Sequence, residues 1–283
     1  MATQSEKAEA FRQLHHQPRP LILPNAWDVP SARSFEEAGF PAVATSSAGL
    51  MVSHGYRDGQ EMPRKEFLRA TGAIAKALDV PLSADIVAGY GRGSAGVAAT
   101  VRQIIDVGAV GINLEDVDPG RGTLVPVAAQ VRKIKKVREV AVAAGVPIVI
   151  NARTDAFRHA AGEAPARLEE AIRRAVRYRD AGADCLYPMG VTDGPSIETF
   201  VRAVEFPTNV MVRKGLPPLA ELERIGVKRI SFGPSASYAT MGLLRRIGEE
   251  VLNRGSFDLL VDGAISFDEL NRLAVPRGSA PAP

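Results

Sequence analysis

The sequence predicts one α/β domain, a single (β/α)8 TIM-type barrel. The 283-residue length is close to that of a typical barrel of this kind. Short apolar runs recur about every 20 to 45 residues, which leaves room for one strand, one helix and two loops in each unit. Segments with helical spacing alternate with these runs, and alternating units of this kind predict a parallel sheet with right-handed crossovers. Eight units favour closure into a barrel over an open doubly wound sheet.

The expected strands are apolar runs, most of which follow a small residue and a glycine or another turn former. This pattern is typical of a helix end that leads into a buried strand. The eight strands are expected within residues 20–28, 38–45, 78–85, 107–116, 144–155, 181–188, 207–212 and 225–233.

The clearest helical segments between these strands have Pro or Ser near the first turn in several cases. They lie at residues 63–78, 95–107, 125–144, 166–181 and 235–253. We therefore assign residues 1–253 to the barrel domain and 254–273 to a C-terminal helical arm. The helix expected at 266–273 has no strand partner, so it either packs on this barrel or docks on another subunit. Residues 274–283 have the composition of a flexible tail.

Composition excludes several classes of protein. With 35 Lys and Arg against 32 Asp and Glu, the net charge of +3 makes nucleic acid an improbable partner. No apolar run approaches the roughly 18 residues of a membrane span, and the N-terminus lacks the order of a signal peptide. We expect no membrane partner and a cytoplasmic location. The single cysteine, Cys185, excludes an internal disulfide and a cysteine-based zinc site.

Polar residues collect where the predicted strands end, which is where barrels of this class place their sites. Several acidic side chains converging there would be costly to bury unpaired, so they suggest a cation or a basic ligand. The residues at or just beyond the strand ends are Asn25, Asp28, Ser46, Ser47, Asp85, Glu115, Asp116, Asn151, Arg153, Asp155 and Asn209.

The acidic residues each have an ordinary structural alternative. Asp85 could cap the helix beginning near Ser94, but nine residues separate the two, so a metal role is favoured. Glu115 and Asp116 are adjacent on a strand and face opposite ways. We expect Glu115 to enter the barrel mouth and Asp116 to form a salt bridge. By itself, Asp58 reads as a turn residue before a glycine.

The remaining candidates are weaker. Arg153 ends an apolar run and needs an anion, either a barrel carboxylate or a substrate carboxylate, and we favour the substrate. Cys185 is expected to be a packed core thiol, and His54 is expected not to touch ligand. Residues 91–96 match the dinucleotide pattern G-x-G-x-x-G, but they follow the third strand and begin several residues beyond its end. A nucleotide site is therefore disfavoured.

Ordered motifs across residues 10–273 resemble the isocitrate lyase and phosphoenolpyruvate mutase superfamily, and in particular its oxaloacetate decarboxylase-like members with a short gating loop. The motifs are PNAWD, TSSAGL followed by HGYRD, ADIVAGYG, GINLEDVD, NARTDAF and SFGPS. The resemblance implies Mg²⁺, with Mn²⁺ as an alternative, and a small oxo-acid substrate. It also implies a homo-oligomer, a dimer or tetramer exchanging C-terminal helices.

The same resemblance implies roles for individual residues. Ser46, Ser47 and the amide of Ala48 would bind the substrate's carboxylate and oxo groups. Asp85 would be the direct metal ligand, while Asp58 and Glu115 would hold the metal's waters. Substrate contacts would also come from Arg153 and Asn209, and the residues expected to take part in catalysis are Ser46, Arg153 and Asp58.

Two departures from the family pattern limit the expected activity. The family's second acid, two residues after Asp85, is Val87 here. The loop VDPGRGTLVPV is short and lacks the catalytic cysteine stretch of isocitrate and methylisocitrate lyases, as well as the gating stretch of the phosphonomutases. We therefore expect a Mg²⁺-dependent lyase that cleaves or decarboxylates a small 2-oxo or 2-hydroxy dicarboxylic acid through a metal-stabilised enolate. The alternatives are P–C bond chemistry, as in a phosphonomutase or phosphonopyruvate hydrolase, and a non-catalytic, metal-poor member.

Overall fold

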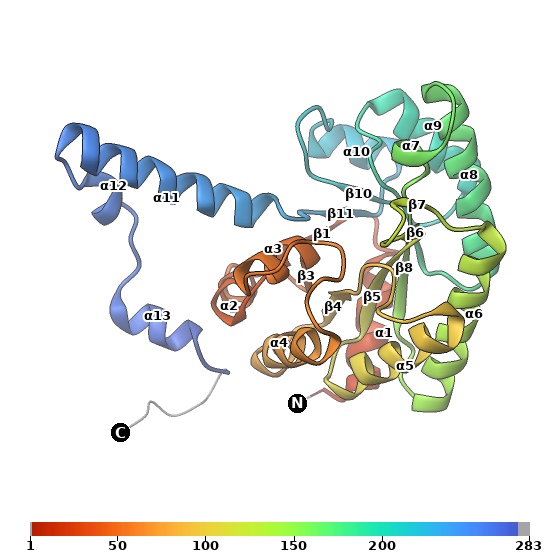
Figure 1. The fold of residues 1–283 in the computed structure, drawn as a ribbon, viewed down its shortest axis with the longest axis horizontal. Coiled ribbons are helices and arrows are strands. Elements are labelled where there is room, and N and C mark those ends of the chain that lie inside the picture. Colours follow the sequence, from red (N-terminus) through yellow and green to blue (C-terminus); the bar gives the residue numbers. More distant parts are fainter. Residues whose placement is uncertain (1, 277–283) are drawn as a thin grey trace.

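The computed structural model describes residues 2–276, and it confirms an α/β fold built on parallel strands (Figure 1). The first strand position is divided at Pro24, which has no N–H to donate to a strand ladder. The strands that follow one another around the sheet are β1 (Leu21–Leu23) with β2 (Asn25–Ala26), β3 (Val43–Thr45), β4 (Leu82–Asp85), β5 (Gly111–Glu115), β8 (Val149–Thr154), β9 (Cys185–Pro188), β10 (Asn209–Met211) and β11 (Arg229–Ser231).

Strand pairing follows chain order, as expected for a TIM-type barrel. One sheet has the order β2-β3-β4-β5-β8-β9 and the other has the order β1-β11-β10, and every neighbouring pair in them is parallel. The sheets are joined where β1 continues into β2, and again by a parallel bridge between Leu186 and Thr208. The strand ends therefore form one ring, and their side chains can converge.

Helices surround this ring of strands (Figure 1). The five helices that the sequence predicted within the barrel domain begin and end within two residues of the predicted ranges, because their apolar spacing marks the buried face. The helices that follow the strands are α2 (Val29–Glu37), α3 (Ser47–Ser53), α4 (Arg64–Ala77), α5 (Gly93–Asp106), α6 (Val127–Ala144), α7 (Ala156–His159), α8 (Ala164–Asp180), α9 (Gly194–Val204) and α10 (Leu219–Ile225).

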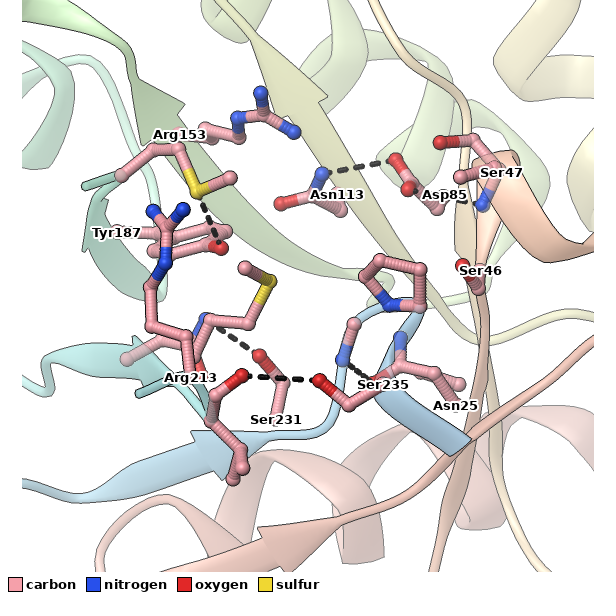
Figure 2. A pocket seen from close by; sticks show the side chains of 18 of the residues that line it. Asn25, Ser46, Ser47, Asp85, Asn113, Arg153, Tyr187, Arg213, Ser231 and Ser235 are labelled. Atoms are coloured by element: carbon pink, nitrogen blue, oxygen red, sulfur yellow. Dashed lines mark hydrogen bonds between the residues drawn. The ribbon is translucent and has the colours of Figure 1, made fainter. Parts of the chain in front are cut away.

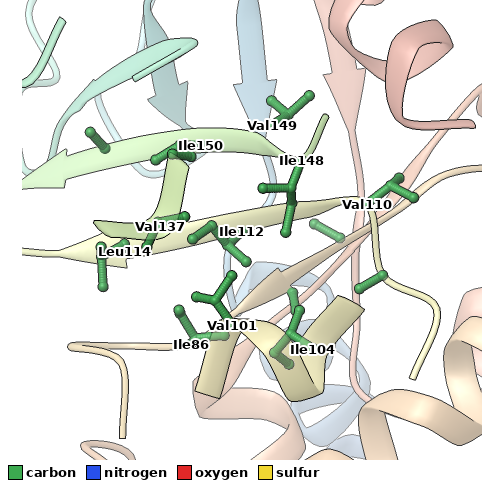
Figure 3. Close-up of a cluster of buried hydrophobic side chains, with 14 of the residues drawn as sticks. Ile86, Val101, Ile104, Val110, Ile112, Leu114, Val137, Ile148, Val149 and Ile150 are labelled. Carbon is green, nitrogen blue, oxygen red and sulfur yellow. The ribbon is translucent and has the colours of Figure 1, made fainter. Parts of the chain in front are cut away.

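Strand side chains alternate between the helices and the barrel interior. Figure 3 shows Ile112 and Leu114 of β5 beside Val101 and Ile104 of α5, and all four are fully buried. The residue between the two on β5, Asn113, faces the other way, into the barrel. This alternation directs apolar residues toward the helices and polar residues toward the interior.

The N-terminal end of the barrel is closed by α1 (Gln4–Leu14). Its Phe11 is fully buried against Gly111, the first residue of β5. A Cβ atom at Gly111 would lie 2.6 Å from Phe11 Cε1, so only glycine leaves room for the ring. The interior is therefore accessible from the opposite end, where the strands terminate.

The C-terminal segment leaves the barrel and returns to it (Figure 1). The long helix α11 (Ser235–Arg254) projects outward and leads through α12 (Asp258–Val261) to α13 (Phe267–Leu273). Arg272 of α13 forms an ion pair with Glu37 of α2, so this part of the predicted arm packs on its own barrel. Most of the predicted tail, 277–283, lies outside the described residues. No helix within residues 2–276 is both long and apolar enough to cross a bilayer.

Candidate functional site

A cavity of about 490 Å³ opens at the C-terminal ends of the strands. Figure 2 shows side chains from several strands pointing into it. Seven of the eight residues predicted to form the site line this cavity, namely Ser46, Ser47, Ala48, Asp58, Asp85, Arg153 and Asn209. The eighth, Glu115, lies beside the cavity and is bound to Arg153. The structure thus brings the predicted residues together from six separate segments.

Ser46 and Ser47 lie where β3 passes into α3. Ser46 caps the helix, because its hydroxyl accepts a hydrogen bond from the N–H of Gly49 at 3.2 Å. A Cβ atom at Gly49 would lie 3.0 Å from Trp27 Cβ, so the glycine lets this turn pack tightly against the preceding strand end. Packing against Trp27 therefore fixes the position of the turn. The N–H of Ser47 points to Asp85 Oδ2 at 3.2 Å.

Asp85 is oriented by hydrogen bonds to both carboxylate oxygens. Asn113 Nδ2 donates to its Oδ1 at 2.9 Å, and Asn151 Nδ2 donates to Asn113 Oδ1, also at 2.9 Å. The three residues stand on adjacent strands in one register, β4, β5 and β8. Asp85 does not cap α5, whose first turn has no side-chain cap. The helix-cap alternative for Asp85 is therefore wrong.

Asp58 lies near Asp85, although the two are 27 positions apart in the chain. As a whole residue, Asp58 is exposed at the rim of the cavity. The protein around its carboxylate nevertheless reduces the hydration of that group, and this burial together with the charge of Asp85 raises the pKa of Asp58. A hydrogen bond from Ser47 opposes this rise. Two carboxylates that disfavour each other's charge suit a cation between them. Within residues 2–276, however, no three His, Cys, Asp or Glu side chains are grouped closely enough to enclose a metal by themselves.

Arg153 is held by two protein carboxylates. Its Nη1 lies 2.8 Å from Glu115 Oε2, while Nε and Nη2 donate to Asp155 at 2.7 and 2.8 Å. Its guanidinium also lies 5.9 Å from the ring centre of Tyr187. The sequence left two anions open for Arg153, a barrel carboxylate or a substrate carboxylate. The structure contains the barrel carboxylates. A guanidinium has five N–H groups and these contacts use three, which leaves two for a ligand.

Glu115 and Asp155 share one cation, the guanidinium of Arg153. Burial raises the pKa of Glu115 to about 8, although Arg153 opposes the rise. The two carboxylates raise the pKa of the Arg153 guanidinium, which stays charged. The Arg153 guanidinium therefore remains charged within the same cavity as Asp58 and Asp85.

Asp116 faces away from Glu115, as predicted, and forms the expected salt bridge with Arg174 at 3.0 Å. It is fully buried and also accepts hydrogen bonds from the Tyr178 hydroxyl at 2.7 Å and the Asp155 N–H at 2.9 Å. Because Asp155 holds Arg153, this network anchors the guanidinium to α8. Asp28, in contrast, does not join the site but caps α2 through a 2.8 Å hydrogen bond from the Ser31 N–H.

Val87 occupies the position of the family's missing acid, and its backbone is unusual. Its φ of 53° lies in the left-handed region, which a β-branched residue rarely adopts. The side chain is buried, and the carbonyl accepts a 2.9 Å hydrogen bond from the N–H of Glu115. The segment keeps a backbone shape suited to Gly, Asn or Asp although its residue is valine.

Other sequence candidates have structural explanations. Gly91 and Gly96 of the dinucleotide-like pattern contact each other, and a Cβ at Gly91 would lie 2.3 Å from the Gly96 carbonyl carbon. Burial raises the pKa of the Cys185 thiol to about 12, as expected for a core residue. His54 does not line the cavity, and its Nδ1 lies 2.8 Å from the carbonyl oxygen of Leu50.

The short loop after β5 folds as a hairpin. Its two strands are β6 (Val117–Asp118) and β7 (Thr123–Leu124), paired antiparallel. It contributes no residue to the cavity lining. Residues 117–127 contain no Cys, His or Lys, so no side chain of those types can reach a ligand from this loop.

Sequence reasoning missed several residues of the cavity. Asn25, Asn113, Asn151 and Tyr187 line it, but we assigned none of them a role in binding or catalysis. The alternation GINLE was the available signal, because Asn113 and Glu115 stand on one face of β5. Arg158, Arg213 and Lys214 add positive charge at the rim. They lie in loops or a short helix, where the sequence has no periodicity to place them.

Comparison with known proteins identifies the family. Residues 11–252 match the model of phosphoenolpyruvate phosphomutase. The 2,3-dimethylmalate lyase of Eubacterium barkeri is 30% identical over 282 residues, covering 94% of this chain and 93% of that protein.

Solved structures agree with this match. The structure of a lyase/mutase candidate from Burkholderia cenocepacia J2315 is 36% identical with a TM-score of 0.87, covering 95% of both chains. A phosphonopyruvate hydrolase in complex with oxalate and Mg²⁺ is 25% identical with a TM-score of 0.81, covering 94% of both chains. The chain therefore belongs to the phosphoenolpyruvate mutase and isocitrate lyase superfamily, whose members include lyases and mutases.

Proposed function

We propose that this protein is a Mg²⁺-dependent carbon–carbon lyase that cleaves or decarboxylates a small 2-oxo or 2-hydroxy dicarboxylic acid. Oxaloacetate decarboxylation is the model reaction. One observation supports this most directly: Asp85 and Asp58 face Arg153 across a single cavity at the strand ends. Such a cavity offers one region to a cation and another to a carboxylate.

The residues fit a divalent cation. Asp85 and Asp58 are oxygen donors whose mutual repulsion a cation would relieve, and Mg²⁺ commonly keeps several waters and few protein ligands. Asp85 would bind the ion directly, and Asp58 and Glu115 would hold its waters. When bound, the ion supplies Lewis-acid stabilisation of negative charge on the substrate's oxo oxygen. The similarity to the phosphonopyruvate hydrolase crystallised with oxalate and Mg²⁺ supports this assignment.

The substrate is bound by the chain's own polar groups. Ser46, Ser47 and the Ala48 N–H would hold the carboxylate and oxo oxygens beside Asp85. Across the cavity, Arg153 would bind a carboxylate through its two remaining N–H groups. Asn209, whose amide lies 3.2 Å from the Ser231 hydroxyl, would contact the substrate deeper in the barrel.

The short hairpin favours decarboxylation over aldol-type cleavage. In oxaloacetate the bond to the departing carboxylate breaks, CO₂ leaves, and its electron pair forms the enolate of pyruvate. A proton from water then adds to the carbon that lost CO₂. No acid from the hairpin is required, which agrees with the absence of Cys, His and Lys from residues 117–127.

A second candidate is chemistry at a P–C bond. Arg158, Arg213 and Lys214 line the rim, and clustered cations suit a phosphonate dianion better than a neutral group. Hydrolysis of phosphonopyruvate would yield pyruvate and phosphate, so one product assay tests both candidates.

The test is release of pyruvate from oxaloacetate, 2,3-dimethylmalate and phosphonopyruvate, with Mg²⁺ or with a chelator. We expect metal-dependent turnover of oxaloacetate, abolished in Asp85→Ala and Arg153→Ala. Arg121→Ala is the control, since Arg121 is an exposed hairpin residue outside the cavity lining. Metal-dependent turnover of phosphonopyruvate alone would favour the second candidate. Absence of pyruvate from all three acids would contradict both the lyase and the phosphonopyruvate hydrolase.

We further propose that two or more chains associate through α11 and the C-terminal arm. Apolar side chains of α11, α12 and the loop between them are exposed, including Leu244, Leu252, Phe257 and Val261. Exposed apolar area of this kind commonly marks a protein interface. Light scattering should therefore show a dimer or tetramer, and Leu252→Asp should shift the population toward monomer. Monomeric wild-type protein at micromolar concentration would contradict this assembly.

A further inference from the structure

The deepest part of the cavity contains a buried guanidinium that the proposed reaction does not use. Arg229 is the first residue of β11 and only 2% of its surface is exposed. It lines the cavity together with Ser231, two residues further along the same strand. Ile230, between them, packs into a separate apolar cluster outside the barrel. Arg229 therefore lies inside the barrel, near the end that α1 closes.

Arg229 has few partners for a buried cation. Its Nη1 lies 3.5 Å from His15 Nε2, and its guanidinium lies 5.9 Å from the ring centre of Phe11. Its Nε has no hydrogen-bond partner. No carboxylate among residues 2–276 lies within ion-pair distance of it. Arg153 and Arg174 differ in this respect, since each of them contacts two carboxylates.

The histidine beside Arg229 does not supply a negative charge. His15 Nδ1 lies 2.8 Å from the Phe11 carbonyl oxygen, so this nitrogen carries the proton and Nε2 offers its lone pair to Arg229. Burial and the charge of Arg229 lower the pKa of His15 to about 3, which keeps the ring neutral. A buried cation next to a neutral ring still lacks a counter-ion.

Two more buried polar atoms of the same cavity have no partner. They are Ser83 Oγ and Asn151 Oδ1, and both residues line the cavity. Ser83 lies close to the ring of Phe11, over which the Arg229 guanidinium stands. This follows from Gly111, where an added Cβ atom would contact both Ser83 Oγ and Phe11. Buried polar atoms are rarely left without partners, so these atoms together indicate a polar ligand.

We propose that Arg229 is the cation of a second, inner anion-binding subsite, which takes a carboxylate-sized anion with Ser83 as an additional donor. Since α1 closes the barrel below it, the anion must enter through the mouth. The source we favour is the distal carboxylate of a substrate longer than oxaloacetate, which would reach past Arg153 to Arg229 while the 2-oxo end lies at Ser46 and Asp85. This source rests on the proposed function and names its substrate class: a 2-oxo diacid long enough to span the cavity. The other source is a free inorganic anion.

The first arm of the test compares two acids of equal length in the presence of Mg²⁺. Calorimetry would measure the affinity of 2-oxoadipate, of 2-oxohexanoate, which lacks the distal carboxylate, and of oxalate, which is too short to reach Arg229. We expect wild-type protein to prefer 2-oxoadipate at least tenfold. Arg229→Met should lose this preference and keep its oxalate affinity within about twofold, while Arg229→Lys should retain part of it. Lys228→Met is the matched control, because it removes the same charge from the neighbouring residue, whose amine contacts the Gln17 carbonyl outside the cavity.

The second arm tests for a free anion. The unfolding temperature would be measured in chloride or nitrate and in a bulky organic anion at the same ionic strength. If the subsite holds an inorganic ion, chloride or nitrate should raise the unfolding temperature of wild-type protein but not that of Arg229→Met. Absence of both the diacid preference and the anion effect would overturn the proposal. Loss of oxalate binding in Arg229→Met would also overturn it, since that outcome indicates a structural role. If wild-type protein fails to bind oxalate with Mg²⁺, the proposed function fails, and the second arm still reports on Arg229.

Discussion

The side-chain amide of Asn113 donates a 2.9 Å hydrogen bond to Oδ1 of Asp85, and Asn151 in turn donates to Asn113. Residues that orient a metal ligand commonly change metal affinity by about 10- to 100-fold when they are replaced. We therefore expect Asn113→Ala to weaken Mg²⁺ binding by that factor, measured as the Mg²⁺ dependence of oxalate binding. Asn151→Ala should have a smaller effect because it acts through Asn113. Equal effects, or none, would contradict this chain of orientation.

The buried carboxylate of Asp116 is expected to stabilise the fold as well as the site. Asp116→Asn leaves the Arg174 guanidinium without its full counter-charge, so the free energy of unfolding should fall by about 3–5 kcal/mol. Tyr178→Phe removes one hydrogen bond to the charged group and should cost about 1.5–3 kcal/mol. Urea unfolding measures both. The control is Arg173→Ala, which breaks a half-exposed ion pair with Glu170 and should cost less than about 1 kcal/mol. A loss in Asp116→Asn no larger than this control would refute the role.

Val87 offers a test of the missing acid. Asp and Asn tolerate the left-handed backbone better than valine, so both substitutions relieve strain of order 1–3 kcal/mol while losing buried apolar area. Val87→Asp adds a carboxylate near Asp85. Without metal, repulsion between the two carboxylates should lower the unfolding temperature. Added Mg²⁺ should then raise the unfolding temperature of this variant by more than it raises that of wild-type protein. Val87→Asn has the same shape without the charge. If the two variants respond alike to Mg²⁺, position 87 does not contribute to a metal site.

His15 should give the protein part of its acid sensitivity. Its pKa is lowered to about 3 in the folded protein, from an ordinary value near 6.5, so the unfolded chain binds the proton more readily. The stabilising contribution is fully present above about pH 6.5 and is lost as the pH falls from there toward 3. His15→Gln should flatten the dependence of the unfolding free energy on pH in this window. Identical curves for wild type and His15→Gln would show that the prediction is wrong.

Much of the fold could be predicted because its signals are local. Apolar spacing of 3.6 residues located α4, α5, α6, α8 and α11, and short apolar runs located the strands. The rule that barrel sites lie at strand C-termini then selected Ser46, Asp85 and Arg153, which do line one cavity. Strand boundaries were less accurate, because an apolar run extends into the turns at both ends. Asp28 follows the first strand as predicted, but it caps α2 instead of joining the cavity.

What the sequence by itself determined is therefore the order of strands and helices, the family, and the set of polar residues at the strand ends. The tertiary structure decided which partner each of those residues has. Arg153 is shared by Glu115 and Asp155, and Arg229 meets His15 across 214 residues of chain. Periodicity reports which face of an element is buried, whereas pairing, counter-charge and the φ of Val87 depend on contacts between distant segments. Those contacts form only when the ring of strands is complete.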